Sequence, residues 1–156
     1  MKISELICED LILTDLKGKD LSGVLQEFSG ALHNAGKFSN SQLLYERLYE
    51  REKQESTGIG NGVAIPHCKI DSLQDVILAI GYSEIGVDFR AIDEKPTYFF
   101  FLVVSPSNSS VLHLRALAAL SRLLKSPNFL SALKERPGKK DLIALIRKEE
   151  EESLVK

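Results

Sequence analysis

Apolar residues recur along much of the chain at the spacing of an amphipathic helix. From Asp20 to Gly36 they fall every three or four positions and so line one face of a predicted helix. That face consists of Leu21, Val24, Leu25, Phe28, Ala31 and Leu32. A second helix is predicted from a cap at Ser39 or Asn40 to about Arg51. The same reasoning predicts helices over about 109–125, from Pro127 and after Pro137-Gly138.

Short apolar runs between the helices predict strands at 11–13, 76–82 and 98–104. The last run, YFFFLVV, is apolar at every position, which is typical of a central strand covered on both faces. Strands and helices alternate without a repeat, and no linker is long enough to divide the chain. The sequence therefore predicts one α/β domain over residues 1–156, layered around a mixed sheet.

Composition excludes several classes of function. The formal net charge of the 156 residues is −2, so no overall field attracts nucleic acid or a membrane surface. No apolar run approaches the roughly 20 residues of a membrane span, and the N-terminus lacks a signal segment. Cys8 and Cys68 are too few for a disulfide framework or a zinc site. We expect a cytoplasmic protein without direct membrane insertion and without nucleic-acid binding.

The candidate chemistry is concentrated in residues 56–67, STGIGNGVAIPH. Glycines alternate at Gly58, Gly60 and Gly62, and glycine permits backbone conformations that let a loop approach a ligand closely. Pro66 restricts the backbone, so His67 should leave the strand-like run 63–65 in a defined direction. The alternative is a tight turn into an edge strand, with the histidine there by chance. Neither a dinucleotide fingerprint nor a nucleotide P-loop fits this spacing of glycines.

A second histidine begins the apolar face of the long helix that follows the central strand. His113 precedes Ala116, Leu117, Leu120 and Leu124 at helical spacing, whereas Arg115 and Arg122 fall on the opposite, solvated face. The sheet edge at the end of such a strand is where ligands bind in open α/β folds. The alternative is a core histidine that is satisfied by a backbone carbonyl.

Arg51 lies at the end of the second helix, directly before the glycines. It continues the apolar stripe of Leu44 and Leu48, whereas Glu52 and Lys53 are expected to be solvated. An arginine in this place suits a bidentate contact with an anion. The predicted site is a phosphohistidine site without metal or cofactor, built from His67, His113, Arg51 and a phosphate-binding loop. The loop residues are Ser56, Thr57, Gly58, Gly60 and Gly62.

The whole segment from Arg51 to His67 resembles the signature of the fructose/mannitol-type IIA proteins of the bacterial sugar phosphotransferase system. The resemblance covers nearly the whole chain, including Leu112-His113-Leu114. It implies a three-layer α/β/α sandwich with a mixed sheet. It also implies that His67 accepts a phosphoryl group from the histidine-containing phosphocarrier protein and passes it to a IIB partner. His113 matches the family's second active-site histidine, and Arg51 matches its arginine.

Two positions depart from the family pattern. Cys68 stands where glycine usually follows the phosphorylated histidine, and Arg115 stands where some members have another histidine. We expect Cys68 to be structural; a catalytic thiol is the alternative. The acidic run 149–152 is expected to be a solvated helix end or a frayed tail.

Within this family the segment STGIGNGVAIPH resembles most the free-standing nitrogen-regulatory members. The first interpretation is therefore a phosphoryl acceptor whose phosphorylation state controls binding to a regulatory protein target. The alternative is a free-standing fructose- or mannitol-specific IIA component that passes phosphoryl to a IIB partner for sugar uptake. A binding module that is not phosphorylated is less consistent with the presence of His67, His113 and Arg51.

Overall fold

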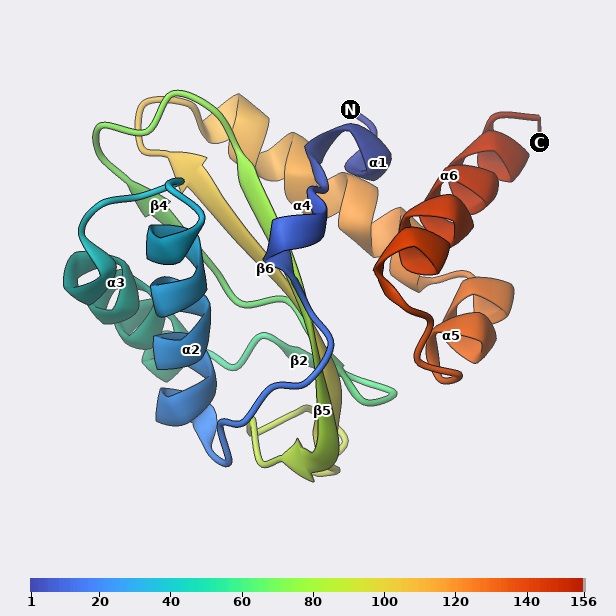
Figure 1. Cartoon of the computed structure of the whole chain (residues 1–156), viewed down its shortest axis with the longest axis horizontal. Helices are drawn as coiled ribbons and strands as arrows, with labels where there is room; N and C mark the ends of the chain where they lie inside the picture. Colours follow the sequence, from blue (N-terminus) through green and yellow to red (C-terminus); the bar gives the residue numbers. More distant parts are fainter. Residues whose placement is uncertain (156) are drawn as a thin grey trace.

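A mixed β-sheet lies between two layers of helices (Figure 1). The computed structural model describes residues 1–155, with side chains as far as Ser153. One face of the sheet is covered by α2 (Leu21–Asn34) and α3 (Ser41–Gln54). The other face is covered by α1 (Ile3–Leu6), α4 (Ser110–Leu124), α5 (Pro127–Leu133) and α6 (Lys139–Val155). The predicted three-layer α/β/α architecture is confirmed.

The sheet is built around a long antiparallel pair of strands. Its order is β1 (Ile12–Leu13), β5 (Ile77–Val87), β6 (Thr97–Pro106), β3 (Val63–Ala64) and β2 (Gly58–Gly60), and β4 (His67–Ile70) also pairs with β6. Strand β1 runs parallel to β5, and both β3 and β4 run parallel to β6. Strands β5 and β6 are antiparallel, as are β2 and β3. The sheet is therefore mixed, as predicted.

Strand β6 contributes to the cores on both faces of the sheet. Phe99, Phe101 and Val103 pack with residues of α4, α5 and α6. Phe100, Leu102 and Val104 pack with residues of α2 and α3. Because side chains alternate between the faces of a strand, a strand covered on both faces must be apolar throughout. This explains the uninterrupted apolar run in the sequence.

Polar side chains fix where four of the helices begin. Asp20, Asn40, Ser109 and Ser126 each accept a hydrogen bond from the backbone N–H three residues further along. Such caps satisfy N–H groups that have no partner within the helix. For α3 the cap is Asn40 and not Ser39.

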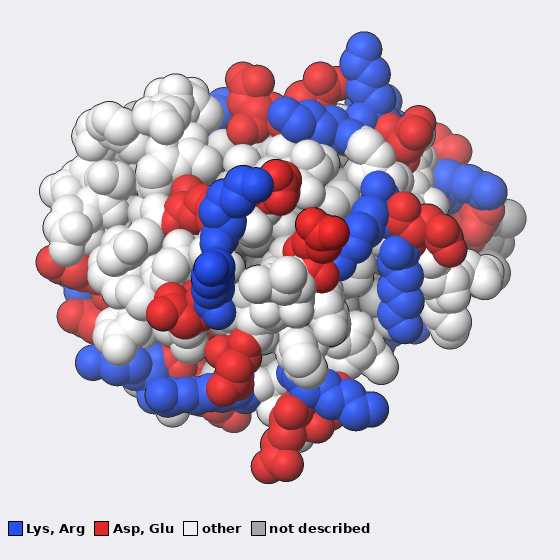
Figure 2. Space-filling model, turned by 60° about the horizontal axis from the view of Figure 1, so that its bottom comes forward, with Lys and Arg blue, Asp and Glu red and all other residues white. Residues whose placement is uncertain are grey.

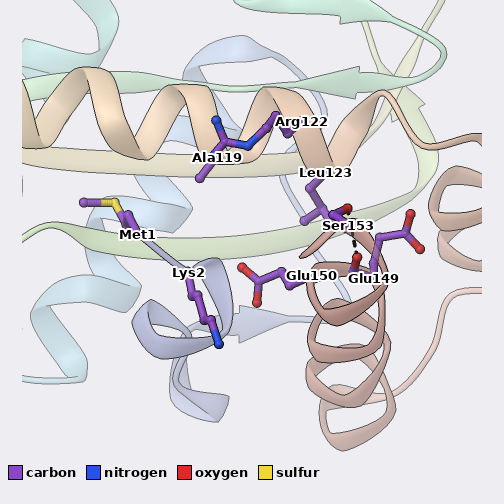
Figure 3. Close-up of a pocket in the computed structure, with 8 residues that line it drawn as sticks. All are labelled: Met1, Lys2, Ala119, Arg122, Leu123, Glu149, Glu150 and Ser153. Atoms are coloured by element: carbon purple, nitrogen blue, oxygen red, sulfur yellow. Dashed lines mark hydrogen bonds between the residues drawn. The ribbon is translucent and has the colours of Figure 1, made fainter. Parts of the chain in front are cut away.

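The N-terminal segment was not predicted to form helices, but it contains α1 and the 3-10 turn η1 (Glu9–Leu11). Helix α1 is held by Glu150, whose carboxylate accepts hydrogen bonds from the backbone N–H groups of Ile3 and Ser4. Figure 3 shows Glu150 projecting from α6 toward this segment. The prediction that residues 149–152 are merely solvated is therefore wrong for Glu150, because its carboxylate binds N–H groups at the start of α1 that have no partner within the helix.

Candidate functional site

The strand that carries His67 is interrupted by Pro66. Strands β3 and β4 both lie alongside β6 and pair with it in the same parallel register, with Ala64 beside Phe100 and His67 beside Val103. Proline has no N–H for the ladder, but the Pro66 carbonyl accepts the N–H of Val103 at 2.9 Å. His67 therefore opens β4 directly after this break, whereas the sequence had placed it beyond the end of a strand.

The imidazole of His67 is anchored by its own segment of backbone. Its Nδ1 lies 2.7 Å from the carbonyl oxygen of Ile65. A carbonyl oxygen can only accept a hydrogen bond, so Nδ1 carries the proton and Nε2 keeps a free lone pair. Burial lowers the pKa of His67 below its ordinary value; Arg51 lowers it further, while the bond to Ile65 opposes the shift. The ring is therefore neutral at pH 7, with Nε2 as its unprotonated nitrogen.

His113 lies beside His67, although the two residues are far apart in the sequence. The ring centroids are 5.4 Å apart. His113 is 7% exposed, and its Nδ1 lies 2.7 Å from Oγ of Ser105, at the end of β6. The pKa of His113 is lowered to about 4, chiefly by burial and further by the positive charges of a protonated His67, of Lys69 and of Arg51. The predicted burial of His113 is confirmed, and its partner is a serine hydroxyl instead of a backbone carbonyl.

Arg51 is half-buried at the end of α3 and lines the same hollow as the two imidazoles. Its Nη1 donates a hydrogen bond of 2.8 Å to the carbonyl of Glu55, which holds the guanidinium over the end of the helix. The structure thus brings Arg51, His67 and His113 together, from α3, β4 and α4.

These three residues line a shallow hollow of about 450 Å³, which we call the histidine hollow. Its lining is Arg47, Glu50, Arg51, Gln54, His67, Cys68, Lys69, His113 and Leu117. Two of its cations, Arg47 and Lys69, were not identified from the sequence. Their spacing could have revealed them, because Arg47 lies one helical turn before Arg51, and Lys69 follows His67 by two residues on the same face of β4.

The predicted phosphate-binding loop lies apart from the histidine hollow and is partly a strand. Among the described residues, none of Ser56, Thr57, Gly58, Gly60 and Gly62 lines the hollow. Gly58 and Gly60 belong to β2, where a Cβ on Gly58 would lie only 2.8 Å from the Cα of Ala91. Ser56 donates to the carbonyl of Phe89 at 2.7 Å. The glycine at position 58 is thus explained by close packing of the backbone, and phosphate binding by this loop stays a prediction.

Glu52 corrects another prediction, because it is buried and not solvated. Its carboxylate accepts hydrogen bonds from the backbone N–H and the hydroxyl of Thr57, at 2.6 and 2.7 Å. Burial raises the pKa of Glu52, while the bonds from Thr57 and the charge of Arg51 act in the opposite direction. A charged side chain can be buried when its oxygens are hydrogen-bonded in this way. Glu52 thereby ties the end of α3 to the segment before β2.

Cys68 is suited to a structural role. Its side chain is 6% exposed and belongs to the core between the sheet and α2 and α3. Burial raises the pKa of the Cys68 thiol to about 12, against the small opposing effect of Arg47. Because the thiolate is the reactive form, this environment opposes a catalytic role.

Charged side chains of both signs are intermingled on the face of the molecule shown in Figure 2. Among the described residues, no group of three or more His, Cys, Asp and Glu side chains is placed to hold a metal ion. None of the helices in residues 1–155 has the length and apolar character needed to cross a membrane.

The chain is similar in sequence to proteins of known family. The family described as phosphoenolpyruvate-dependent sugar phosphotransferase system, EIIA 2, matches residues 5–149. The chain is 33% identical over 135 residues to the nitrogen regulatory protein of Bradyrhizobium diazoefficiens, covering 86% of this chain and 87% of that protein. It is 35% identical over 146 residues to the fructose-specific EIIABC component of Bacillus subtilis, covering 94% of this chain but 23% of that protein.

A solved structure agrees with these sequence relatives. The crystal structure of the nitrogen regulatory protein IIA-Ntr from Neisseria meningitidis matches with a TM-score of 0.84 and 26% identity. The match covers 92% of this chain and 98% of that one. The chain therefore belongs to the EIIA 2 family of the phosphoenolpyruvate-dependent sugar phosphotransferase system.

Proposed function

We propose that this protein accepts a phosphoryl group on Nε2 of His67 from a histidine-containing phosphocarrier protein. The observation that carries the proposal is the 2.7 Å contact between Nδ1 of His67 and the Ile65 carbonyl oxygen. It leaves Nε2 as the unprotonated nitrogen of a neutral ring that lines the histidine hollow. A neutral imidazole with a free lone pair is a competent nucleophile for phosphoryl transfer.

The proposed step exchanges one N–P bond for another. The lone pair of Nε2 forms the new bond to phosphorus, and the electron pair of the donor's N–P bond returns to the donor imidazole. His67 keeps its proton on Nδ1, so its ring becomes positively charged when the phosphoryl group is attached. The hydrogen bond from Nδ1 to the Ile65 carbonyl stabilises that charge. No cofactor or metal is needed for this exchange.

The cations of the histidine hollow support the same step. A phosphoryl group carries about −1.5 to −2 charge, which Arg51 can offset through bidentate contacts. His113 can donate a hydrogen bond from Nε2 to a phosphoryl oxygen if the Ser105 hydroxyl donates to Nδ1. We assign Arg51 and His113 as residues that stabilise the transferred group without carrying it.

Two roles for the phosphorylated protein are supported to different degrees. The first is regulatory: phosphorylation of His67 controls binding to a regulatory protein target. The nitrogen regulatory relative matches this chain over nearly its whole length, and IIA-Ntr shares its fold. The second is a fructose- or mannitol-specific IIA component that passes the group to a IIB protein; the 35% identity to the fructose-specific Bacillus protein favours it.

The test is phosphoryl transfer from a phosphorylated phosphocarrier protein, followed by intact mass measurement. Wild-type protein should gain one phosphoryl group that is labile in acid and stable in base, as expected for a phosphoramidate. His67→Ala should not be labelled, whereas His33→Ala, which changes an exposed histidine elsewhere, should be labelled normally. Full labelling of His67→Ala would refute the assignment.

Substitution of Arg51 tests the rest of the site in the same assay. Arg51→Gln should slow labelling by roughly 30- to 1,000-fold, because about 2–4 kcal/mol of transition-state stabilisation is lost. Lys53→Gln is the matched control, since Lys53 is an exposed cation two residues along the same helix. Equal rates for the two variants would show that Arg51 does not support the transfer.

Transfer to a second protein separates the two roles. A protein that covers the histidine hollow should bind the unphosphorylated form more tightly, because desolvating the phosphoryl charge is costly. A regulatory target should therefore be recovered from host lysate with unphosphorylated protein and lost on phosphorylation. Recovery of only a IIB protein, with transfer of the label to it, would support the sugar-transport role.

A further inference from the structure

A second hollow lies at the opposite end of β6 from the two histidines. It has a volume of about 520 Å³ and is formed by the β2–β3 turn, the β5–β6 connection and the α5–α6 connection. Tyr98 lies on its wall at the start of β6, whereas Ser105, the partner of His113, is near the end of that strand. A strand rises by about 3.3 Å per residue, so the stretch of β6 from Tyr98 to Ser105 separates the two hollows by roughly 20 Å. We call this second site the basic hollow.

The basic hollow has an excess of positive charge. Lys95, Lys134 and Arg136 line it together with one acidic residue, Asp93. The Asp93 carboxylate is already engaged, since it accepts the backbone N–H groups of Asn61 at 3.2 Å and of Lys95 at 3.1 Å. Within the described part of the chain, none of the three cations forms a salt bridge. Their charges are therefore available to a bound anion.

Arg136 is held in place before any ligand binds. Its guanidinium carbon lies 5.3 Å from the ring centroid of Phe99 and 6.0 Å from that of Tyr98. Its Nη2 donates to the carbonyl of Ser83 at 2.7 Å. A guanidinium fixed by two rings and a carbonyl loses little freedom on binding, and its remaining N–H groups can still donate.

The backbone around the basic hollow is unusual. Asn61, Glu94 and Arg136 have φ values of 58°, 59° and 53°, in the left-handed region that side chains other than glycine rarely adopt. Each residue lies in one of the three connections that form the hollow. Strained residues of this kind concentrate at functional sites. Asparagine adopts this region readily, whereas it is costly for Glu94 and Arg136, so two of the three connections are held in costly conformations around one space.

We propose that the basic hollow binds a small organic phosphate or diphosphate. Three cations and the one carboxylate give the hollow a formal charge of +2, which a dianionic ligand balances, and phosphoryl oxygens match a guanidinium fork and two ammonium groups. The volume suits a small molecule. Tyr98 and Pro96 give the hollow an apolar wall against which the organic part of the ligand packs.

The experiment is a titration of the full chain with inorganic pyrophosphate at constant ionic strength, followed by amide chemical shifts. Saturable shifts are expected at Asn61, Gly62 and Arg136. Lys95→Glu combined with Lys134→Glu should weaken binding at these amides by about tenfold, since two exposed charge-assisted contacts are lost together. Both lysines are exposed, so the variant should keep the fold.

The matched control is Lys19→Glu combined with Lys37→Glu, which changes the net charge equally at exposed positions outside the hollow. The control should bind pyrophosphate as the wild type does. Equal weakening in both double variants, or the absence of saturable shifts at the three amides, would overturn the proposal.

Binding at the basic hollow is independent of phosphorylation at His67. Pyrophosphate can also enter the histidine hollow, but that event shifts the amides of β4 and the start of α4. His67→Ala should therefore leave the shifts at Asn61, Gly62 and Arg136 unchanged. If these shifts were lost in His67→Ala, the two hollows would be one linked site, and the proposal of a separate basic hollow would be wrong. This outcome would leave the proposed phosphoryl transfer to His67 untested.

Discussion

The buried, uncharged ring of His113 should make the fold sensitive to mild acid. In the unfolded chain its pKa is near 6.5, whereas in the folded protein it is about 4. The folded state therefore binds fewer protons, so this contribution to stability is complete above pH 6.5 and falls as the pH decreases toward 4. Between pH 7.5 and pH 5 the free energy of unfolding should fall by up to about 2 kcal/mol through this residue.

Urea unfolding of the wild type and of His113→Asn at both pH values measures this contribution. Asparagine keeps a polar atom near Ser105 but does not titrate, so the variant should lose less stability between the two pH values. His33→Asn serves as control, because His33 is exposed. If the wild type and His113→Asn lose stability equally, the acid sensitivity comes from other groups.

At the scale of the elements, the hydrogen bonds between Glu52 and Thr57 join α3 to the hairpin of β2 and β3. Thr57→Val removes one of the two hydrogen bonds to a buried carboxylate and leaves the shape of the side chain almost unchanged. The free energy of unfolding should fall by about 1–3 kcal/mol, because a buried charged group loses a donor. Urea unfolding measures the loss.

Thr14→Val is the matched control, since Thr14 is exposed. It should change stability by no more than about 0.5 kcal/mol. The helix end held by Glu52 also carries Arg51, so Thr57→Val should slow phosphoryl acceptance as well. A variant as stable and as active as the control would show that the Glu52 contact contributes nothing.

The elements differ in how well the sequence predicted them, and the difference has a physical basis. The helix after Asp20 and the strand 98–104 have long apolar patterns, because each buries a face or both faces in a core. Helix α1 and strand β2 span four and three residues, too few for any periodicity. Burial of Glu52 was missed because it depends on a partner five residues away.

For the whole molecule, Glu150 joins the beginning of the described chain to its last helix. Glu150→Ala leaves the N–H groups of Ile3 and Ser4 without this partner, so α1 should detach more often from α6. We expect the free energy of unfolding to fall by roughly 1–3 kcal/mol. Hydrogen exchange in residues 1–13 should become faster, and urea unfolding measures the global effect.

Glu151→Ala is the control for this change, because the neighbouring carboxylate is exposed. It should leave both the exchange rates and the unfolding midpoint near those of the wild type. Unchanged exchange in Glu150→Ala would mean that apolar packing alone holds α1 on α6.

The meeting of the site residues is a property of the whole molecule. The sequence identified His67 through a loop motif and His113 and Arg51 through the apolar stripes of two helices, and the family resemblance then grouped the three. Their proximity depends on the parallel register of β4 with β6 and on how α4 leaves the end of β6. Local spacing could have placed Arg47 beside Arg51 and Lys69 beside His67, but long-range register is not encoded in local periodicity, so only the structure shows that these two pairs meet in one hollow.

The two imidazoles lie side by side at an interplanar angle of 50° but take their orientations from separate parts of the chain. His67 is fixed by a carbonyl two residues away, whereas His113 is fixed by the end of β6. The direction of the His67 ring is thus set within the three residues from Ile65 to His67. A docking protein that displaced α4 would take away a neighbour of His67 and leave its ring pointing as before. The direction of Nε2 is thus independent of the helix that lies beside it.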